Sequence, residues 1–328
     1  MLELAIAAII IALIFDFVNG FNDSANSVAT VIGTRVLRPI HAVTISAVAN
    51  FAGPFIFGVA VATTIAKGIV SPDEITVYMI IGGLAGAITW STMCTYFGLP
   101  ISNSLSLIGG IMGAGIAGLG FEELVYGGLT KVLAGIVIAP IGGMVFGIAL
   151  AGVIIVFFAN RKPAIVNKTF GRLQIISSAW FALTHGANDG QKTMGIIVLI
   201  LFSADLISEI HMPLWVIFAA AGAMGLGTFF GGYKVIKTLG VKITRLKPYQ
   251  GFAAETGGGL MLAIFAIFGI PASTTHAITG TIMGAGAARR KRAVRWKVSR
   301  QIIFSWLITI PGAAGLGIAF TYIIHLFV

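Results

Sequence analysis

Apolar segments long enough to cross a lipid bilayer make up most of this sequence. Residues 132–158, for example, run well past the length of about 18 apolar residues that identifies a transmembrane helix. Only 10% of the residues are charged, against about 25% in soluble domains, and the mean hydropathy is +1.00. The chain is therefore not a soluble globule. We predict an all-α polytopic membrane protein with about 10–12 membrane segments.

The connections between the apolar segments are sorted by charge. Nearly all of the 21 Lys and Arg residues, which give a net charge of +10, lie in four connections, at residues 35–41, 160–172, 234–250 and 288–300. The other connections carry the acids Asp73, Glu74, Glu122, Glu123, Asp205 and Glu209. Basic loops stay on the cytoplasmic side of a membrane, so one threading satisfies every connection, with both termini outside. We therefore expect the basic runs to be cytoplasmic loops of a protein that lies in the lipid bilayer, and we expect no nucleic-acid partner.

Two similar polar clusters interrupt this apolar background, at residues 19–26 and 185–192. The first reads Asn-Gly-Phe-Asn-Asp-Ser-Ala-Asn and the second His-Gly-Ala-Asn-Asp-Gly-Gln-Lys, so that Gly, Asn and Asp recur in the same order, 166 residues apart. A carboxylate deep in an apolar segment is costly unless water, a cation or a partner meets it. Asp23 and Asp189 are therefore candidate functional residues.

A second repeated motif follows each cluster. Leu-Pro-Ile-Ser-Asn-Ser at residues 99–104 and Ile-Pro-Ala-Ser-Thr-Thr at residues 270–275 lie 171 residues apart, and each is followed by Ile-Met-Gly-Ala-Gly. The threading makes the two halves of the chain antiparallel. We therefore predict an inverted-topology repeat, with halves at residues 1–158 and 173–328 and a basic cytoplasmic linker at 159–172.

Segment lengths predict local departures from simple spans. The segments that carry the clusters are about 30 residues long, half as long again as a span needs. Gly20 and Gly186 lower the helix propensity near their middles, so we predict broken helices there. Segments 101–119 and 272–287 are short. We predict that they form re-entrant hairpins, which would bring their tips to the depth of the aspartates; full crossings are the alternative.

Each tip opens an apolar helix with capping side chains, which is typical of an anion site. Free backbone N–H groups and the positive end of the helix dipole point out of a helix N-terminus. Two such tips would supply the neutral donors that an oxyanion with four oxygens needs. The candidate anion ligands are Asn22, Asn188, Ser102, Ser104, Ser273, Thr274 and Thr275.

The same site would hold too much negative charge without a cation. Asp23, Asp189 and a phosphate dianion bring about four negative charges together, and each like pair at about 4 Å costs about 4 kcal/mol even at an effective dielectric constant of about 20. Carboxylate and amide oxygens suit a hard cation. The candidate cation ligands are Asp23, Asp189, Asn26 and Asp16, with sodium held at the first two, and the candidate charge partners are Lys192 and Glu255. The residues therefore predict cation-coupled anion transport, with no cofactor besides the co-transported ion.

With these motifs, the sequence resembles the inorganic phosphate transporter (PiT) family. Residues 15–26 and 185–195 are similar to its two Asn-Asp signatures, and both Pro-containing tips are similar to its tips. The resemblance implies symport of phosphate with sodium or protons, of which we favour sodium, and it implies that the Asn-Asp motifs bind substrate and cation. Asn103 departs from the family, which commonly has Ser-Thr-Thr-His at this tip. The long hydrophilic central loop of animal members is absent, which implies the plasma (inner) membrane of a prokaryote.

Other functions stay open from the residues alone. An intramembrane hydrolase could use His185 and Asp189 as metal ligands, or Ser273 and His276 as nucleophile and base. Neither histidine has a matched partner in the other half, so we expect no enzyme. A passive anion channel would need a positive lining, which buried aspartates oppose. A sulfate symporter would use the same scaffold, and the oligomeric state is open, a homodimer included.

Overall fold

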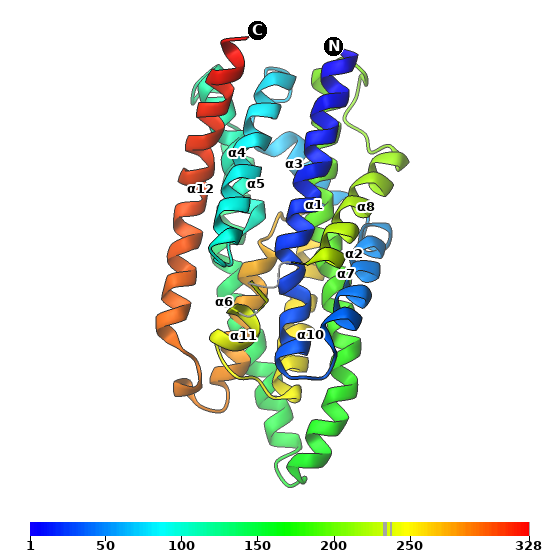
Figure 1. Cartoon of the computed structure of the whole chain (residues 1–328), viewed down its shortest axis with the longest axis vertical. Helices are drawn as coiled ribbons and strands as arrows, with labels where there is room; N and C mark the ends of the chain where they lie inside the picture. The colour runs from blue at the N-terminus through cyan, green and yellow to red at the C-terminus, as the bar shows by residue number, and fades with distance from the viewer. Residues whose placement is uncertain (232–234, 237, 328) are drawn as a thin grey trace.

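Helices make up nearly all of the computed structural model, which describes residues 1–231, 235–236 and 238–327 (Figure 1). No β-strand occurs in these ranges, so the all-α prediction is confirmed. The first half contains α1 (Leu2–Gly33), α2 (Pro39–Phe57), α3 (Ala60–Gly68), α4 (Val77–Tyr96), α5 (Asn103–Leu119) and α6 (Tyr126–Phe157). The second half contains α7 (Pro163–Ser203), α8 (Leu214–Phe230), the π-helix η1 (Thr238–Lys242), α10 (Pro248–Ile267), α11 (Thr274–Ala287), the 3₁₀ helix η2 (Lys291–Ala293) and α12 (Trp296–His325).

Six helices of the described ranges are long and apolar enough to cross a membrane, namely α1, α2, α4, α6, α10 and α12. The apolar helices α5 and α8 have 17 residues each. The helix α7 has 41 residues and carries the polar cluster 185–192 in its interior. The chain is therefore a multi-pass membrane protein.

The hairpins expected from the sequence form as α4–α5 and α10–α11. Both arms of the first lie in the half of the molecule nearer the termini, and both arms of the second lie in the other half (Figure 1). The turn after α4 contains Gly98 at φ +67°, and the turn after α10 contains Gly269 at φ +63°. This left-handed conformation favours glycine. The amide of Leu99 donates to the carbonyl of Cys94, and in the same way the amide of Ile270 donates to the carbonyl of Phe265. A proline follows in both turns, so each helix ends before the next one begins.

The helix breaks predicted at Gly20 and Gly186 are wrong. Both α1 and α7 continue without interruption through these positions. A Cβ atom at Gly20 would lie 2.2 Å from the carbonyl oxygen of Met224 in α8, and one at Gly186 would lie 2.1 Å from that of Asn50 in α2. The two glycines therefore serve close helix crossings, as small residues do in membrane proteins. Propensity alone could not reveal this, because the crossing helices are distant in sequence.

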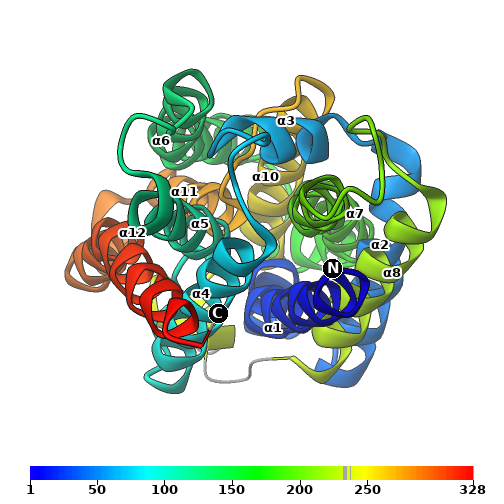
Figure 2. The same cartoon turned by 90° about the horizontal axis from the view of Figure 1, so that it is seen from above.

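The two halves of the chain interlock. The helix α1 packs against α8, and α7 packs against α2, so each helix with a polar cluster is braced by a helix of the other half. In the same way α5 packs against α12, and α11 packs against α6. Seen along the long axis, the hairpins lie between α1 and α7 on one side and α6 and α12 on the other (Figure 2).

The ends of the helices follow the predicted threading. Both termini lie at one end of the molecule, and the basic connections 34–38, 158–162 and 288–295 lie at the opposite end (Figure 1). These three of the four predicted basic connections can therefore share one side of a membrane, whereas the fourth, 234–250, lies partly outside the described residues. Which side faces the cytoplasm stays a prediction.

Candidate functional site

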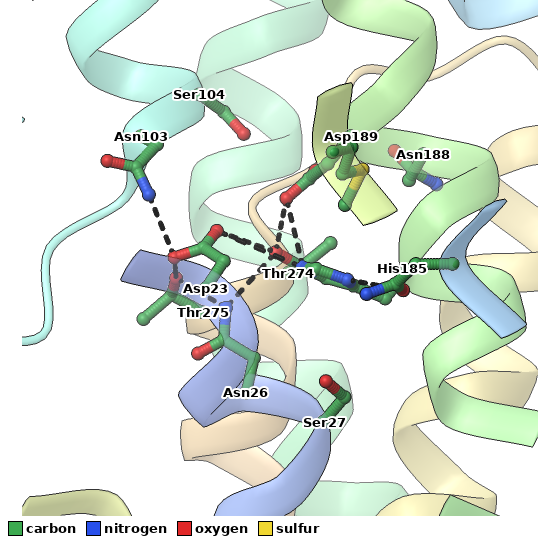
Figure 3. Close-up of polar contacts among 12 residues, drawn as sticks. Asp23, Asn26, Ser27, Asn103, Ser104, His185, Asn188, Asp189, Thr274 and Thr275 are labelled. Carbon is green, nitrogen blue, oxygen red and sulfur yellow. Dashed lines mark hydrogen bonds and ion pairs between the residues drawn. The ribbon is translucent and has the colours of Figure 1, made fainter. Parts of the chain in front are cut away.

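Asp23 lies where α1 meets the tips of both hairpins. Asn103 donates from its Nδ2 atom to Asp23 Oδ1 at 2.9 Å (Figure 3). The hydroxyls of Thr275 and Thr274 lie 3.5 Å from Oδ1 and Oδ2 of the same carboxylate. The first hairpin thus supplies the closest donor, and the second hairpin supplies two more distant ones.

Asp189 is the equivalent residue on α7, and its surroundings carry charge. Thr274 donates its hydroxyl to Asp189 Oδ2 at 2.8 Å. The ammonium group of Lys192, one helical turn further on, forms an ion pair with Asp189 Oδ1. Asn103 and Thr274 occupy matching positions 171 residues apart, so each aspartate is held by the first helical residue of the hairpin in its own half.

His185 joins the two aspartates. Its Nε2 atom lies 3.3 Å from Asp189 Oδ2 and 3.9 Å from Asp23 Oδ2. One ligand atom from each of these three residues falls within 4.8 Å of the other two, a spacing that could hold a metal ion. The ring is oriented from its other side, where Nδ1 lies 2.9 Å from the side-chain oxygen of Asn50 in α2. Asn50 in turn donates to the hydroxyl of Thr228 in α8 at 2.9 Å.

Lys192 ties the charged cluster to both tips. Its side chain is fully buried, and its ammonium group contacts Ser104 of the first tip in addition to Asp189. It also donates to the carbonyl oxygen of Ala272 in the second tip at 2.7 Å. Two buried carboxylates face one buried ammonium group and the imidazole of His185, so the cluster carries an excess negative charge whenever the imidazole is neutral. Such a charge needs a cation to be stable away from water.

The helices α5 and α11 both begin at this cluster. Ser102 and Ser273 are the N-caps, and their hydroxyl oxygens accept from the amides of Leu105 at 3.3 Å and His276 at 3.2 Å. The positive ends of two helix dipoles therefore face the carboxylates. Every polar side chain of the cluster and of the tips is at most 5% exposed. A narrow pocket borders the site at Asn22, Asp23, Asn26 and Thr275.

Two more of the predicted ligands lie inside the cluster. Asn26 donates to the hydroxyl of Thr275 at 3.0 Å, and Asn22 donates to the side-chain oxygen of Asn103 at 3.3 Å. Both residues follow one face of α1 next to Asp23. With Asp23, Asp189, Ser104, Thr274, Thr275 and Lys192, they form a single group of contacts.

Three predicted residues are placed elsewhere. Asn188 points away from the carboxylates (Figure 3) and bonds the carbonyl of Leu262 in α10 and the amide of Ala272. It therefore holds the second tip in position. Glu255 lies in a separate group, where it accepts from Thr30, Ser177 and Gln174. Asp16 lies two turns before Asp23, and neither of its carboxylate oxygens has a hydrogen-bond partner among the described residues.

Two contacts could not be read from the sequence pattern as interpreted above, that of Asn103 with Asp23 and that of Asn50 with His185, although His185 was already a candidate metal ligand with Asp189. Asn103 was noted only as a departure from the family pattern, although its side chain is the closest donor to Asp23. The alignment of Asn103 with Thr274 in the repeat was the signal that could have shown this. No comparable signal marks Asn50, which reaches His185 from another helix.

The geometry expected of a serine hydrolase is not formed in the part of the chain that the structure describes. His276 Nδ1 faces the carbonyl of Ile136 at 3.4 Å, and its ring packs on Trp306 with 3.8 Å between the ring centroids. Ser273 Oγ accepts the backbone amide of His276 and not its imidazole. The two side chains therefore cannot act as nucleophile and base in this arrangement.

Comparisons with known proteins agree on one family. The model of the “Phosphate transporter family” matches residues 19–317. A “Probable low-affinity inorganic phosphate transporter” of Rhizobium meliloti is 47% identical over 95% of this chain and 93% of its own. A protein of Bacillus subtilis with the same description is 40% identical over 99% of this chain and 98% of its own. The solved structure titled “The sodium-dependent phosphate transporter” superposes with a TM-score of 0.89 at 25% identity, covering 99% of this chain and 100% of that one.

Proposed function

Because the chain belongs to the phosphate transporter family, and is therefore a transporter and not an enzyme, we propose that it imports inorganic phosphate together with sodium ions by alternating access. The import would take place across the plasma membrane of a prokaryote. The observation that carries the proposal is the pair of buried carboxylates at the meeting point of two hairpin tips, Asp23 with neutral donors beside it and Asp189 paired with a buried ammonium group.

The charge balance of the cluster supports coupling to a cation. Phosphate would add one or two negative charges to a site that already contains two carboxylates. A cation at Asp23 and Asp189 would remove the repulsion, which is about 4 kcal/mol for each like pair at an effective dielectric constant of about 20. His185 would keep the two carboxylates at a fixed spacing. Sodium is favoured because the nearby ligands are carboxylate, amide and hydroxyl oxygens, and because the similar solved structure is titled as sodium-dependent.

The tips are the proposed site of the phosphate ion. Asn22, Ser104, Thr274 and Thr275 supply neutral donors beside two helix N-termini, which bind anions through backbone N–H groups and the dipole. The caps Ser102 and Ser273 and the amide of Asn188 would then shape the tips and not bind phosphate through their side chains. Lys192 would face the anion from the carboxylate side.

The two halves, at residues 1–158 and 173–328, are the proposed moving parts. Each would be one copy of an inverted repeat joined by the linker 159–172. The hairpin of the first half lies nearer the termini, and the hairpin of the second half lies nearer the opposite end of the molecule (Figure 1). Release of one tip at a time would therefore expose the site first to one side of the membrane and then to the other.

Uptake into proteoliposomes tests the proposal. The purified chain is reconstituted, and the uptake of radiolabelled phosphate is measured under an inward sodium gradient and then under an inward proton gradient without sodium. We expect accumulation above the equilibrium level with sodium only, and we expect unlabelled phosphate to compete much better than sulfate. Accumulation driven by protons alone would assign the coupling to protons. Uptake that ignores both gradients would contradict coupled transport.

A further inference from the structure

A second group of buried polar side chains lies between α1 and α7, outside the cluster described above. Asp16 is seven residues before Asp23 on the same helix, which places it about 10 Å away along the helix axis. Its side chain is fully buried. Asn19, one turn along α1, and Thr193 of α7 lie near enough to influence its carboxyl group but form no hydrogen bond to it.

The oxygen atoms of this group lack partners. Both carboxylate oxygens of Asp16, the side-chain oxygen of Asn19 and the hydroxyl oxygen of Thr193 are buried without a hydrogen bond to any described residue. Buried polar oxygens are almost always hydrogen-bonded, and an unpaired buried carboxylate costs several kcal/mol. Four such oxygens on two adjacent helices therefore call for a ligand that is itself positive.

The nearest lysine does not fill this need. The ammonium group of Lys192 contacts Asp189, Ser104 and the carbonyl oxygen of Ala272, so its donors are used within the first cluster. We propose that Asp16, Asn19 and Thr193 form a second cation site, separate from Asp23 and Asp189, which binds a hard monovalent cation such as sodium. One carboxylate with an amide and a hydroxyl oxygen is a donor set that suits such an ion.

The second site exists in one half of the chain only. The residues 166 positions away from Asp16 and Asn19 are Ala182 and His185, which offer no matching oxygens. The equivalent of Thr193 is Ser27, whose hydroxyl is 2.6 Å from that of Ser46 and is therefore already paired. The site would add a single ion to the transport cycle, and that ion would hold α1 and α7 together beside the first cluster. Its role in the cycle rests on the proposed cation coupling, whereas the binding itself can be measured without transport.

Equilibrium binding of radiolabelled sodium to the full-length purified transporter tests the second site. We expect the wild type to bind two sodium ions and Asp16→Asn to bind one. Thr193→Val keeps the shape of the side chain and should lower the affinity for one of the two ions about 10–100-fold, as the loss of residues around a bound metal does. The matched control is Thr279→Val, because Thr279 is also fully buried with an unpartnered hydroxyl among the described residues, yet lies on α11. This control should bind like the wild type.

The outcomes separate the second site from the proposed function. If Asp16→Asn and Thr193→Val both bind as many sodium ions as the wild type, with unchanged affinity, the second site is overturned. If the wild type binds one ion that only Asp23→Asn removes, the second site is also overturned, while sodium coupling at the first cluster stands. If Asp16→Asn binds sodium like the wild type but loses a pH dependence of uptake, Asp16 carries a proton and the cation site is again overturned.

Discussion

At the scale of single residues, the two aspartates are matched in sequence but not in surroundings. Asp189 has its own ammonium partner in Lys192, whereas the residue in the same place after Asp23 is Asn26. The partners closest to Asp23 are neutral donors. Asp23 therefore lacks a lysine partner of its own, and this carboxylate is the stronger candidate for holding the cation proposed above.

The first prediction compares the two carboxylates. Asp23→Asn keeps the side-chain size and removes the charge that would attract the cation, so phosphate uptake should stop or lose most of its dependence on the cation gradient. Asp189→Asn should show the weaker coupling defect, because Lys192 already offsets its charge. The measurement is the initial rate of uptake in proteoliposomes over a range of sodium concentrations. Wild-type sodium dependence in both variants would show that the carboxylates are structural.

The second prediction concerns the buried ion pair. Lys192→Met leaves Asp189 without its cation in a site closed to water, so the free energy of unfolding should fall by about 3–5 kcal/mol. Adding Asp189→Asn to this variant removes the unpaired charge and should restore part of the loss. Thermal unfolding in detergent measures both effects. Lys131→Met serves as the control, because Lys131 is exposed and should change the stability little.

At the scale of helices, the crossings next to the clusters decide how closely α1 and α7 approach their neighbours. Gly20 meets α8, and Gly186 meets α2, in each case with backbone atoms at the crossing. Backbone atoms cannot turn aside as a flexible side chain can. A methyl group at either position must therefore push two helices apart, and with them the aspartate three residues later.

The third prediction follows from these crossings. Gly20→Ala and Gly186→Ala should each lower the free energy of unfolding by about 1–3 kcal/mol, the usual cost of overpacking. Gly222→Ala on α8 is the control, because a Cβ atom there has no described atom within 4 Å. It should be neutral or gain up to about 1 kcal/mol from helix propensity. Equal effects at all three positions, measured by thermal unfolding, would contradict the close crossings.

The hairpin tips are the other elements that decide the chemistry, and the fourth prediction concerns them. Thr275→Val removes a hydroxyl from the second tip without changing its shape. If this hydroxyl binds phosphate, the free energy of phosphate binding should become less favourable by about 1.5–3 kcal/mol, the range for a hydrogen bond to a charged group. Thr279→Val, one turn further along α11, should leave the affinity unchanged. Phosphate binding by calorimetry measures both, and equal affinities would place the anion elsewhere.

At the scale of the whole molecule, the distribution of charge fixes the predicted orientation. The basic connections 34–38, 158–162 and 288–295 lie at the end opposite to the termini, and the acidic connections lie near the termini (Figure 1). A membrane with its cytoplasmic face at the basic end satisfies the positive-inside rule for these connections.

The fifth prediction tests this orientation with single cysteines. The native Cys94 is first replaced by Ser. Cysteines at Lys162 and Lys291 should then resist an impermeant thiol reagent added outside intact cells, while a cysteine at Glu123 should react. All three should react after the membrane is made permeable, which controls for burial. External labelling at Lys291 would contradict the threading and the inverted repeat with it.

The sequence by itself determined the features that depend on local chemistry. Long apolar runs require helices, because backbone groups in lipid must be paired within the segment. The Gly-x-Pro turns at Gly98 and Gly269 determined where each hairpin reverses. Carboxylates in apolar segments marked Asp23 and Asp189 as functional candidates, and the repeated motifs indicated that the tips would meet them, as the contacts of Asn103 and Thr274 confirm.

Only the tertiary structure decided which polar groups contact one another in the charged cluster and which position the helices and tips around it. Gly20 and Gly186 proved to be crossing points and not breaks, since α8 and α2 lie against them. Asn188 turned out to hold the second tip, and Asn50 to orient His185, because each reaches a helix far away in sequence. The physical reason is the same in every case: a side chain in a dry interior takes the partner that packing brings to it, and local sequence does not record that partner.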